Sequence, residues 1–267
     1  EGKVWLSEGG FFEGGSVALP SQLIEGRGTF GSLRLSPDGR RLAFVSDRGS
    51  HSFVGIYDFR QDQLSYPDAS VDRDTSPVWS PDGSRVAFVR LPARVGPTSI
   101  FTALREGTPW SIRLIDLESE AHEGFELWRA VHGPGSVFRG LVADRQLFWT
   151  RDDSLIFPWE LDGWTHLYTI PAAGGPPRLL TPGAFEVEAV SMAPDRSYVV
   201  FSSNEADIDR RHLWRVRPGD LRPTALTRGE SIEQSPVVVG DGSVIFLSSD
   251  GKRPLEPAIL SDGEVRL

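Results

Sequence analysis

The stretch Leu33-Arg-Leu-Ser-Pro-Asp-Gly-Arg-Arg-Leu-Ala-Phe44 recurs along the chain in four recognisable variants. These are Pro77-Val-Trp-Ser-Pro-Asp-Gly-Ser-Arg-Val-Ala-Phe88, Trp149-Thr-Arg-Asp-Asp-Ser-Leu-Ile-Phe157, Val190-Ser-Met-Ala-Pro-Asp-Arg-Ser-Tyr-Val-Val-Phe201 and Pro236-Val-Val-Val-Gly-Asp-Gly-Ser-Val-Ile-Phe246. Their closing phenylalanines lie 44, 69, 44 and 45 residues apart, so the unit is about 44 residues long and one copy carries an insertion. A fixed period of this size indicates a repeat architecture.

Each copy has the pattern of an apolar strand, a tight turn and a second apolar strand. In the Ser-Pro-Asp-Gly turns at 36–39 and 80–83, proline presets its backbone angle, aspartate bonds the chain ahead of it, and glycine accepts a positive φ. Further alternating stretches follow each turn, such as residues 165–170, and no helical period is sustained. The sequence therefore predicts an all-β chain, a β-propeller of four-stranded antiparallel blades.

We expect a single propeller domain over residues 1–267. Five blades are visible, at 31–70, 76–135, 145–183, 185–229 and 231–267. Residues 1–30 are closing or flanking strands. They either complete the last blade or belong to a sixth. Completion of the last blade would remove the exposed sheet edges of an open ring. An incomplete excerpt of a larger ring is the competing interpretation. The insertion falls near residues 91–110, and a long loop there is either functional or merely a flexible linker.

The charge balance is acidic: 28 Lys and Arg against 37 Asp and Glu give a net charge of −9. Binding to nucleic acid and to anionic membranes depends on positive charge, so we expect neither partner. The apolar runs are far shorter than the ~20 residues that span a bilayer. Without cysteine, the chain suits cytoplasm and periplasm equally, so its localisation stays open.

The chain contains no motif that carries catalysis. A nucleophile elbow needs Gly-x-Ser-x-Gly, and the nearest stretches, at 14–18 and 229–233, both fail at the last position. The five histidines show no spacing typical of a metal site, so we expect neither a metal nor a cofactor. His166 and His212 take equivalent positions in successive units, which favours a structural role over that of a proton donor lining the channel.

An ordered series of segments resembles the amino-terminal propeller of the dipeptidyl peptidase IV branch of the prolyl oligopeptidase family. The segments are Phe157-Pro-Trp-Glu-Leu-Asp-Gly-Trp-Thr-His-Leu-Tyr168, Leu179-Leu-Thr-Pro-Gly-Ala-Phe-Glu-Val187, Val200-Phe-Ser-Ser-Asn-Glu205 and His212-Leu-Trp214. With the weaker repeats, the resemblance covers about residues 31–250. We interpret its signature residues as structural: Glu160, Asp162, Gly163, Trp164, His166, Tyr168, Asn204 and Glu205.

The resemblance implies a two-domain serine peptidase in which a propeller precedes an α/β-hydrolase domain. This chain would be the propeller, which in the family covers the active site and restricts access to short peptides. Its expected partners are the C-terminal α/β-hydrolase domain of the same parent chain and the peptide substrate. Catalysis would then belong to residues outside this sequence, which opens at Glu1 and has Met192 as its single methionine.

One departure from the family pattern concerns the segment before the second Ser-Pro-Asp-Gly turn. Dipeptidyl peptidases of this family grip the free amino terminus of the substrate with an adjacent pair of glutamates there, whereas this chain has Val71-Asp-Arg-Asp-Thr-Ser-Pro77. An acylaminoacyl- or oligopeptidase-like preference is therefore equally compatible with the sequence. Arg73 or Asp74 could contact a peptide end by charge-assisted hydrogen bonds, and a solvated turn is the simpler interpretation.

Two other functions remain open. One is a TolB-like, free-standing propeller scaffold that binds a protein or peptide partner in its channel. The other is a propeller enzyme such as a lactonase or glycosidase, which would need convergent acids or a calcium ion at the channel mouth.

Overall fold

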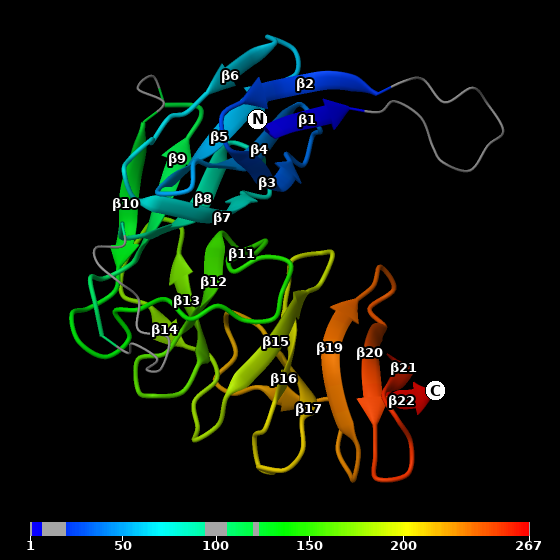
Figure 1. The fold of residues 1–267 in the computed structure, drawn as a ribbon. Coiled ribbons are helices and arrows are strands. Elements are labelled where there is room, and N and C mark those ends of the chain that lie inside the picture. Colours follow the sequence, from blue (N-terminus) through cyan, green and yellow to red (C-terminus); the bar gives the residue numbers. More distant parts are fainter. Residues whose placement is uncertain (1, 7–19, 94–105, 120–122, 267) are drawn as a thin grey trace, which may run out of the picture.

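The computed structural model describes residues 2–6, 20–93, 106–119 and 123–266. Within these ranges the chain forms strands β1 to β22 and no helix (Figure 1). The described part therefore also contains no helix of the length and hydrophobicity that a bilayer span requires.

Twenty of the strands form five antiparallel, four-stranded blades that follow one another along the chain. Blade 1 comprises β3 (Thr29–Leu35), β4 (Arg41–Asp47), β5 (Ser52–Asp58) and β6 (Gln63–Ser65). Blade 2 comprises β7 (Arg73–Trp79), β8 (Arg85–Leu91), β9 (Ser111–Asp116) and β10 (Gly124–Arg129). Blade 3 comprises β11 (Phe148–Trp149), β12 (Ser154–Trp159), β13 (His166–Pro171) and β14 (Arg178–Leu179). Blade 4 comprises β15 (Val187–Met192), β16 (Val199–Ser203), β17 (His212–Val216) and β18 (Thr224–Ala225). Blade 5 comprises β19 (Ile232–Val238), β20 (Val244–Ser249), β21 (Glu256–Ser261) and β22 (Glu264–Arg266).

The all-β, β-propeller class is confirmed. The first strands of neighbouring blades contact one another, β3 with β7, β7 with β11 and β15 with β19, so these strands are the innermost of their blades (Figure 1). Blades 1 and 2 are also joined by a parallel bridge between Ser52 and Arg73, which makes their eight strands one continuous sheet.

The turn between the first two strands of a blade has the chemistry that its sequence predicts. In blade 2, the Ser80 hydroxyl donates to the Asp82 carboxylate at 2.6 Å, and the backbone N–H of Ser84 donates to the same oxygen at 3.0 Å. These bonds lower the pKa of Asp82 to about 2. Gly83 follows at φ +75°, where a side chain would be strained.

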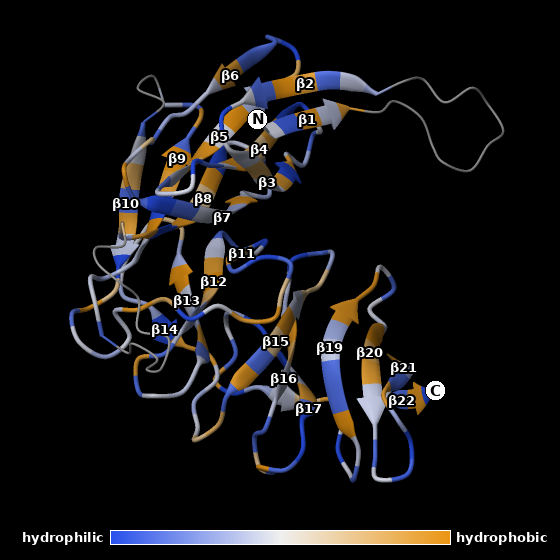
Figure 2. Cartoon of the chain, viewed as in Figure 1, coloured by the Kyte–Doolittle hydropathy of each residue, from blue (hydrophilic) through white to orange (hydrophobic). Residues whose placement is uncertain are grey.

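Apolar side chains are buried between the blades. The largest cluster joins blades 2 and 3 and includes the fully buried Trp110, Trp149 and Phe157. Similar clusters lie between blades 1 and 2, 3 and 4, and 4 and 5. Figure 2 shows the apolar residues concentrated in strands such as β12 and β20. Each blade therefore depends on its neighbours for its core.

The two ends of the series of blades differ. β1 (Gly2–Leu6) and β2 (Ser21–Gly26) form an antiparallel hairpin that covers blade 1, where Val4 and Ile24 are buried against Phe44. On blade 5, Val237 and Ile245 stay 53% and 43% exposed.

The expected closure of the ring by an amino-terminal strand is not formed among the described residues. β1 pairs with β2 alone and β22 with β21 alone. The physical reason is that Val4 and Ile24 of the hairpin are already buried on blade 1. The predicted insertion lies between β8 and β9, and its residues 94–105 fall outside the described ranges.

A methyl group at Gly55 would overlap the ring of Phe44, which is fully buried in blade 1. We expect Gly55→Ala to cost about 1–3 kcal/mol of unfolding free energy through overpacking. Gly31→Ala is the matched control, because nothing lies within 4 Å of a methyl group there. Chemical denaturation of both variants measures the difference, and equal stabilities would contradict this account of the blade core.

Candidate functional site

A cavity of about 620 Å³ lies among the innermost strands. Its lining residues come from β7, β11, β15 and β19 and from the segments 142–145 and 193–196. Most of these residues stand where an innermost strand ends and its tight turn begins. We call this space the axial cavity.

Two neighbouring residues, Asp144 and Arg145, bring opposite charges to the lining. Arg145 donates from Nη2 and Nε to one carboxylate oxygen of Asp144, at 2.6 and 2.9 Å. Arg34, at the end of β3, reaches the same residue: its guanidinium donates to the Asp144 backbone carbonyl and lies 3.6 Å from the carboxylate. Burial lowers the pKa of Arg34, and the charge of Arg145 lowers it further.

Arg196 brings a third guanidinium to the cavity from the β15–β16 turn of blade 4. Its Nη1 donates to the backbone carbonyl of Trp79, in blade 2, at 3.0 Å. Burial, with the nearby charge of Arg145, lowers the pKa of Arg196. Among the described residues, no carboxylate lies within ion-pairing distance of it.

The described lining of the axial cavity offers hydrogen-bond donors but no serine paired with a general base. Serines line the cavity at 191 and 235, yet no histidine is among the lining residues, so neither hydroxyl has the general base that a nucleophilic serine needs. Ser191 also accepts the backbone N–H of Val238 at 3.1 Å. In the described part of the chain, no three metal-binding side chains are grouped closely enough to hold an ion.

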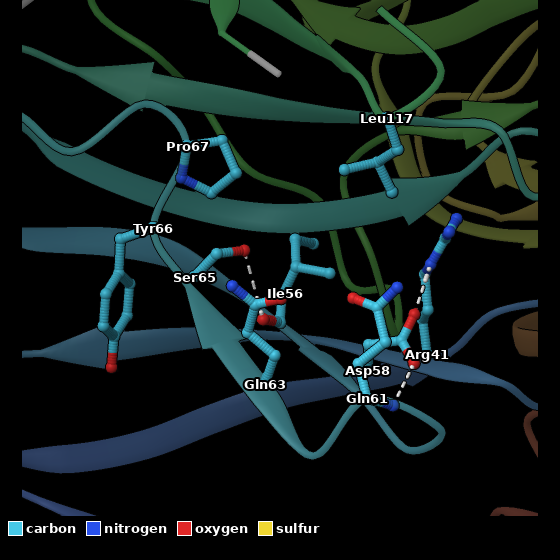
Figure 3. A pocket seen from close by; sticks show the side chains of 9 residues that line it. All are labelled: Arg41, Ile56, Asp58, Gln61, Gln63, Ser65, Tyr66, Pro67 and Leu117. Carbon is cyan, nitrogen blue, oxygen red and sulfur yellow. Dashed lines mark hydrogen bonds and ion pairs between the residues drawn. The ribbon is translucent and has the colours of Figure 1, made fainter. Parts of the chain in front are cut away.

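A second cavity, of about 310 Å³, lies on blade 1 (Figure 3). Its charged side chains, Arg41 and Asp58, bond each other at 3.1 Å, and the N–H of Gln61 donates to Asp58. The Ser65 hydroxyl donates to the Ile56 carbonyl at 3.4 Å (Figure 3). Since Arg41 and Asp58 are already paired with each other, this cavity offers a ligand fewer unpaired charged groups than the axial cavity does.

The two residues predicted to contact a peptide end have separate structural partners. Asp74 is 1% exposed and accepts two bonds from Arg90, at 2.7 and 2.8 Å. Burial outweighs these bonds and raises the pKa of Asp74 to about 6. Arg73 is half-buried, donates to the Gly49 carbonyl at 2.7 Å and lies 3.4 Å from Asp47. Neither lines the axial cavity.

His166 is fully buried at the start of β13. Its Nε2 lies 3.2 Å from the Gly183 carbonyl and its Nδ1 lies 3.2 Å from the Thr181 hydroxyl, which accepts the N–H of Leu167. Burial lowers the pKa of His166. The equivalent His212 approaches Glu233 at 2.8 Å and is also buried. His166 thus ties β13 to the segment that follows β14, and His212 ties blade 4 to β19 of blade 5.

The other signature residues divide between turns and blade contacts. Asp162 accepts the N–H of Trp164 at 3.2 Å, across Gly163 at φ +96°. Glu160 accepts a bond from Arg139 at 3.1 Å. Burial raises the pKa of Tyr168 to about 12.

Asn204 and Glu205 lie directly after β16, in the connection to β17 of blade 4. The Asn204 side chain accepts the N–H of Glu186 at 2.8 Å, which ties this corner to the segment before β15. Glu205 has a buried oxygen without a hydrogen-bond partner among the described residues, and burial raises its pKa. The structure places none of the eight signature residues in the axial cavity.

The arginines of the axial cavity escaped the sequence analysis. One signal could have found Arg196: it occupies the fourth position of Ala-Pro-Asp-Arg, where three other units have glycine. Arg34 and Arg145 carry no such signal, because only the propeller geometry brings blades 1, 3 and 4 to one axis.

Removing one partner of the buried Asp74–Arg90 pair leaves the other less well compensated: among the described residues Arg90 would keep only its contacts with Asp68, and Asp74 would lose its bonded cation. We expect Asp74→Ala to lower the unfolding free energy by about 3–5 kcal/mol. The double variant Asp74→Ala/Arg90→Met should recover much of that loss, since it removes both charges. Urea denaturation of the two single variants and the double variant measures the coupling, and strictly additive losses would show that the pair does not act as a unit.

Comparison with known proteins agrees with the propeller described above. Residues 137–253 match the model of the family described as the dipeptidyl peptidase IV (DPP IV) N-terminal region. A relative in Neosartorya fischeri named "Probable dipeptidyl peptidase 4" is 44% identical over 58 residues, which is 21% of this chain and 8% of that protein. The matched stretch is therefore a small part of the relative's length.

Two solved structures share the fold at low sequence identity. A puromycin-hydrolyzing peptidase of Mycobacterium tuberculosis superposes with a TM-score of 0.62 and 16% identity, over 89% of this chain and 36% of that one. TolB of Acinetobacter baumannii superposes with a TM-score of 0.50 and 19% identity, over 85% and 52%. The resemblance that the sequence shows is confirmed for residues 137–253, which match the dipeptidyl peptidase IV N-terminal region, and the solved structures share the propeller fold.

Proposed function

We propose that this propeller gates access to a serine peptidase active site and helps to select short peptides for it. The active site would belong to a C-terminal α/β-hydrolase domain of the same parent chain. The observation that carries the proposal is the match of residues 137–253 to the dipeptidyl peptidase IV N-terminal region. The axial cavity supports it, since it provides space and hydrogen-bond donors among the innermost strands and lacks a nucleophile with its base.

The division of labour between two domains is testable with the protein encoded by the complete gene. We expect that protein to hydrolyse short peptides and to react with a fluorophosphonate probe at a Gly-x-Ser-x-Gly serine. The 267-residue chain alone should do neither. Peptide hydrolysis by the isolated chain, or a complete protein that does not react with the probe, would refute the proposal.

Gating is tested by narrowing the axial cavity. Val142 lines it and is 67% exposed, so Val142→Trp adds bulk where nothing has to be displaced. In the complete protein we expect kcat/KM for a hexapeptide to fall by about tenfold, while the rate of fluorophosphonate labelling stays unchanged. Val71→Trp is the matched control, because Val71 is 77% exposed and does not line the cavity. Equal effects of the two variants would argue against passage or binding of peptides at this site.

The second candidate is a free-standing scaffold that binds a protein or peptide partner, as the sequence analysis left open. The shared fold with TolB supports this alternative only at the level of architecture. The gene decides between the two: a hydrolase domain encoded in the same reading frame favours the gating propeller, and its absence favours the scaffold.

A further inference from the structure

The axial cavity has an excess of positive charge, although the chain as a whole carries a net charge of −9. Arg145 and Arg196 line the cavity, and Arg34 of β3 bonds to the lining residue Asp144. Asp144 is the one acidic residue among the lining residues that the structure describes. Its single carboxylate is shared by Arg34 and Arg145, so it does not neutralise Arg196, and the charge of the lining favours a further anion.

The side-chain contacts indicate that the arginines are not saturated. Arg34 and Arg145 both share Asp144, and the Nε of Arg34 is buried with no hydrogen-bond partner among the described residues. Within the described ranges, the guanidinium of Arg196 bonds only to a neutral carbonyl, that of Trp79. Partly buried guanidinium groups with unused donors are suited to an anionic acceptor.

The backbone conformation at Arg196 adds a second, weaker observation. Arg196 has φ +57°, at the turn position where Gly39, Gly83 and Gly242 have +69°, +75° and +86° and where blade 3 has Asp153 at +59°. A side chain is disfavoured in this left-handed region, and glycine adopts it freely. The turn would therefore fold more easily with glycine, and keeping an arginine there is a structural cost with no gain for the turn itself. Such local strain commonly accompanies a functional side chain.

We propose that the axial cavity binds a peptide through its terminal carboxylate, held by Arg196 and Arg145. A planar carboxylate matches the fork of an arginine side chain, and about 620 Å³ accommodates a few residues of peptide. The choice of a peptide as the bearer of the carboxylate rests on the proposed function. The carboxylate site itself rests on the three arginines.

The test compares two peptides that differ only in charge at one end. Acetyl-trialanine with a free carboxylate and the same peptide as the carboxamide are titrated into the 267-residue chain by calorimetry. We expect the acid to bind at least about tenfold more tightly than the amide, and this preference to weaken as sodium chloride is raised. Equal affinities, or no binding of either peptide, would overturn the proposal.

Arg196→Gly is the informative variant, because it restores the residue that other turns of this chain use. We expect its Tm to equal or exceed that of the unchanged chain, and the preference for the acid to disappear. Arg145→Gln provides a second variant that leaves the turn intact, with the same expected loss. Arg60→Gln, an exposed arginine of the β5–β6 turn outside the cavity, controls for the change in net charge and should keep the preference. An Arg196→Gly chain that folds and still prefers the acid would contradict the proposal that Arg196 binds the carboxylate.

The result of the peptide-binding test can be distinguished from the result of the gating experiments. The two peptides are compared in the absence of a hydrolase domain, so a lost preference speaks only against the carboxylate site. Conversely, a complete protein without peptidase activity would remove the proposed function and leave the measured preference in place.

Discussion

The structure depends on the burial of each blade against its neighbours. A four-stranded blade has two faces, and in this chain the strands of blades 2, 3 and 4 contribute buried apolar residues to clusters on both sides. No blade has a core of its own, so the blades must be arranged side by side around an axis. That arrangement brings the ends of the innermost strands together and creates the axial cavity. The position of the candidate site is thus a consequence of how the core is built.

Local chemistry made much of this fold predictable. The Ser-Pro-Asp-Gly turns specify a tight connection through bonds within a few residues, and their spacing reports the blade period. Ring closure could not be predicted in this way, because nothing in the alternation of residues 2–6 says whether Val4 is buried on blade 1 or on blade 5. Arg34, Arg145 and Arg196 were missed for a similar reason: they are distant in sequence, and Arg34 and Arg145 have the pattern of ordinary surface residues.

Charged residues serve two distinct purposes in this molecule. Asp74 and Arg90 neutralise each other inside the protein, and Arg113 holds Asp68 in the loop that leads into blade 2. These charged groups hold segments of the chain in place. In the axial cavity the charges do not balance, and the turn that carries Arg196 adopts a conformation that suits glycine better. The contrast separates charges that maintain the fold from charges that remain available to a ligand.

The bridge between Ser52 and Arg73 makes blades 1 and 2 unlike the other neighbouring pairs. Backbone hydrogen bonding runs without a break through their eight strands, and the bonds from Arg90 and Arg113 to Asp68 reinforce the same junction. The other blades form separate four-stranded sheets. Main-chain hydrogen bonds nevertheless cross between blades 3 and 4, from the Arg151 N–H to the Arg196 carbonyl, and between blades 4 and 5, from the Glu233 N–H to the Arg211 carbonyl. Widening the axis to admit a bulky molecule by parting blades 1 and 2, 3 and 4, or 4 and 5 would therefore break backbone bonds as well as separate apolar faces.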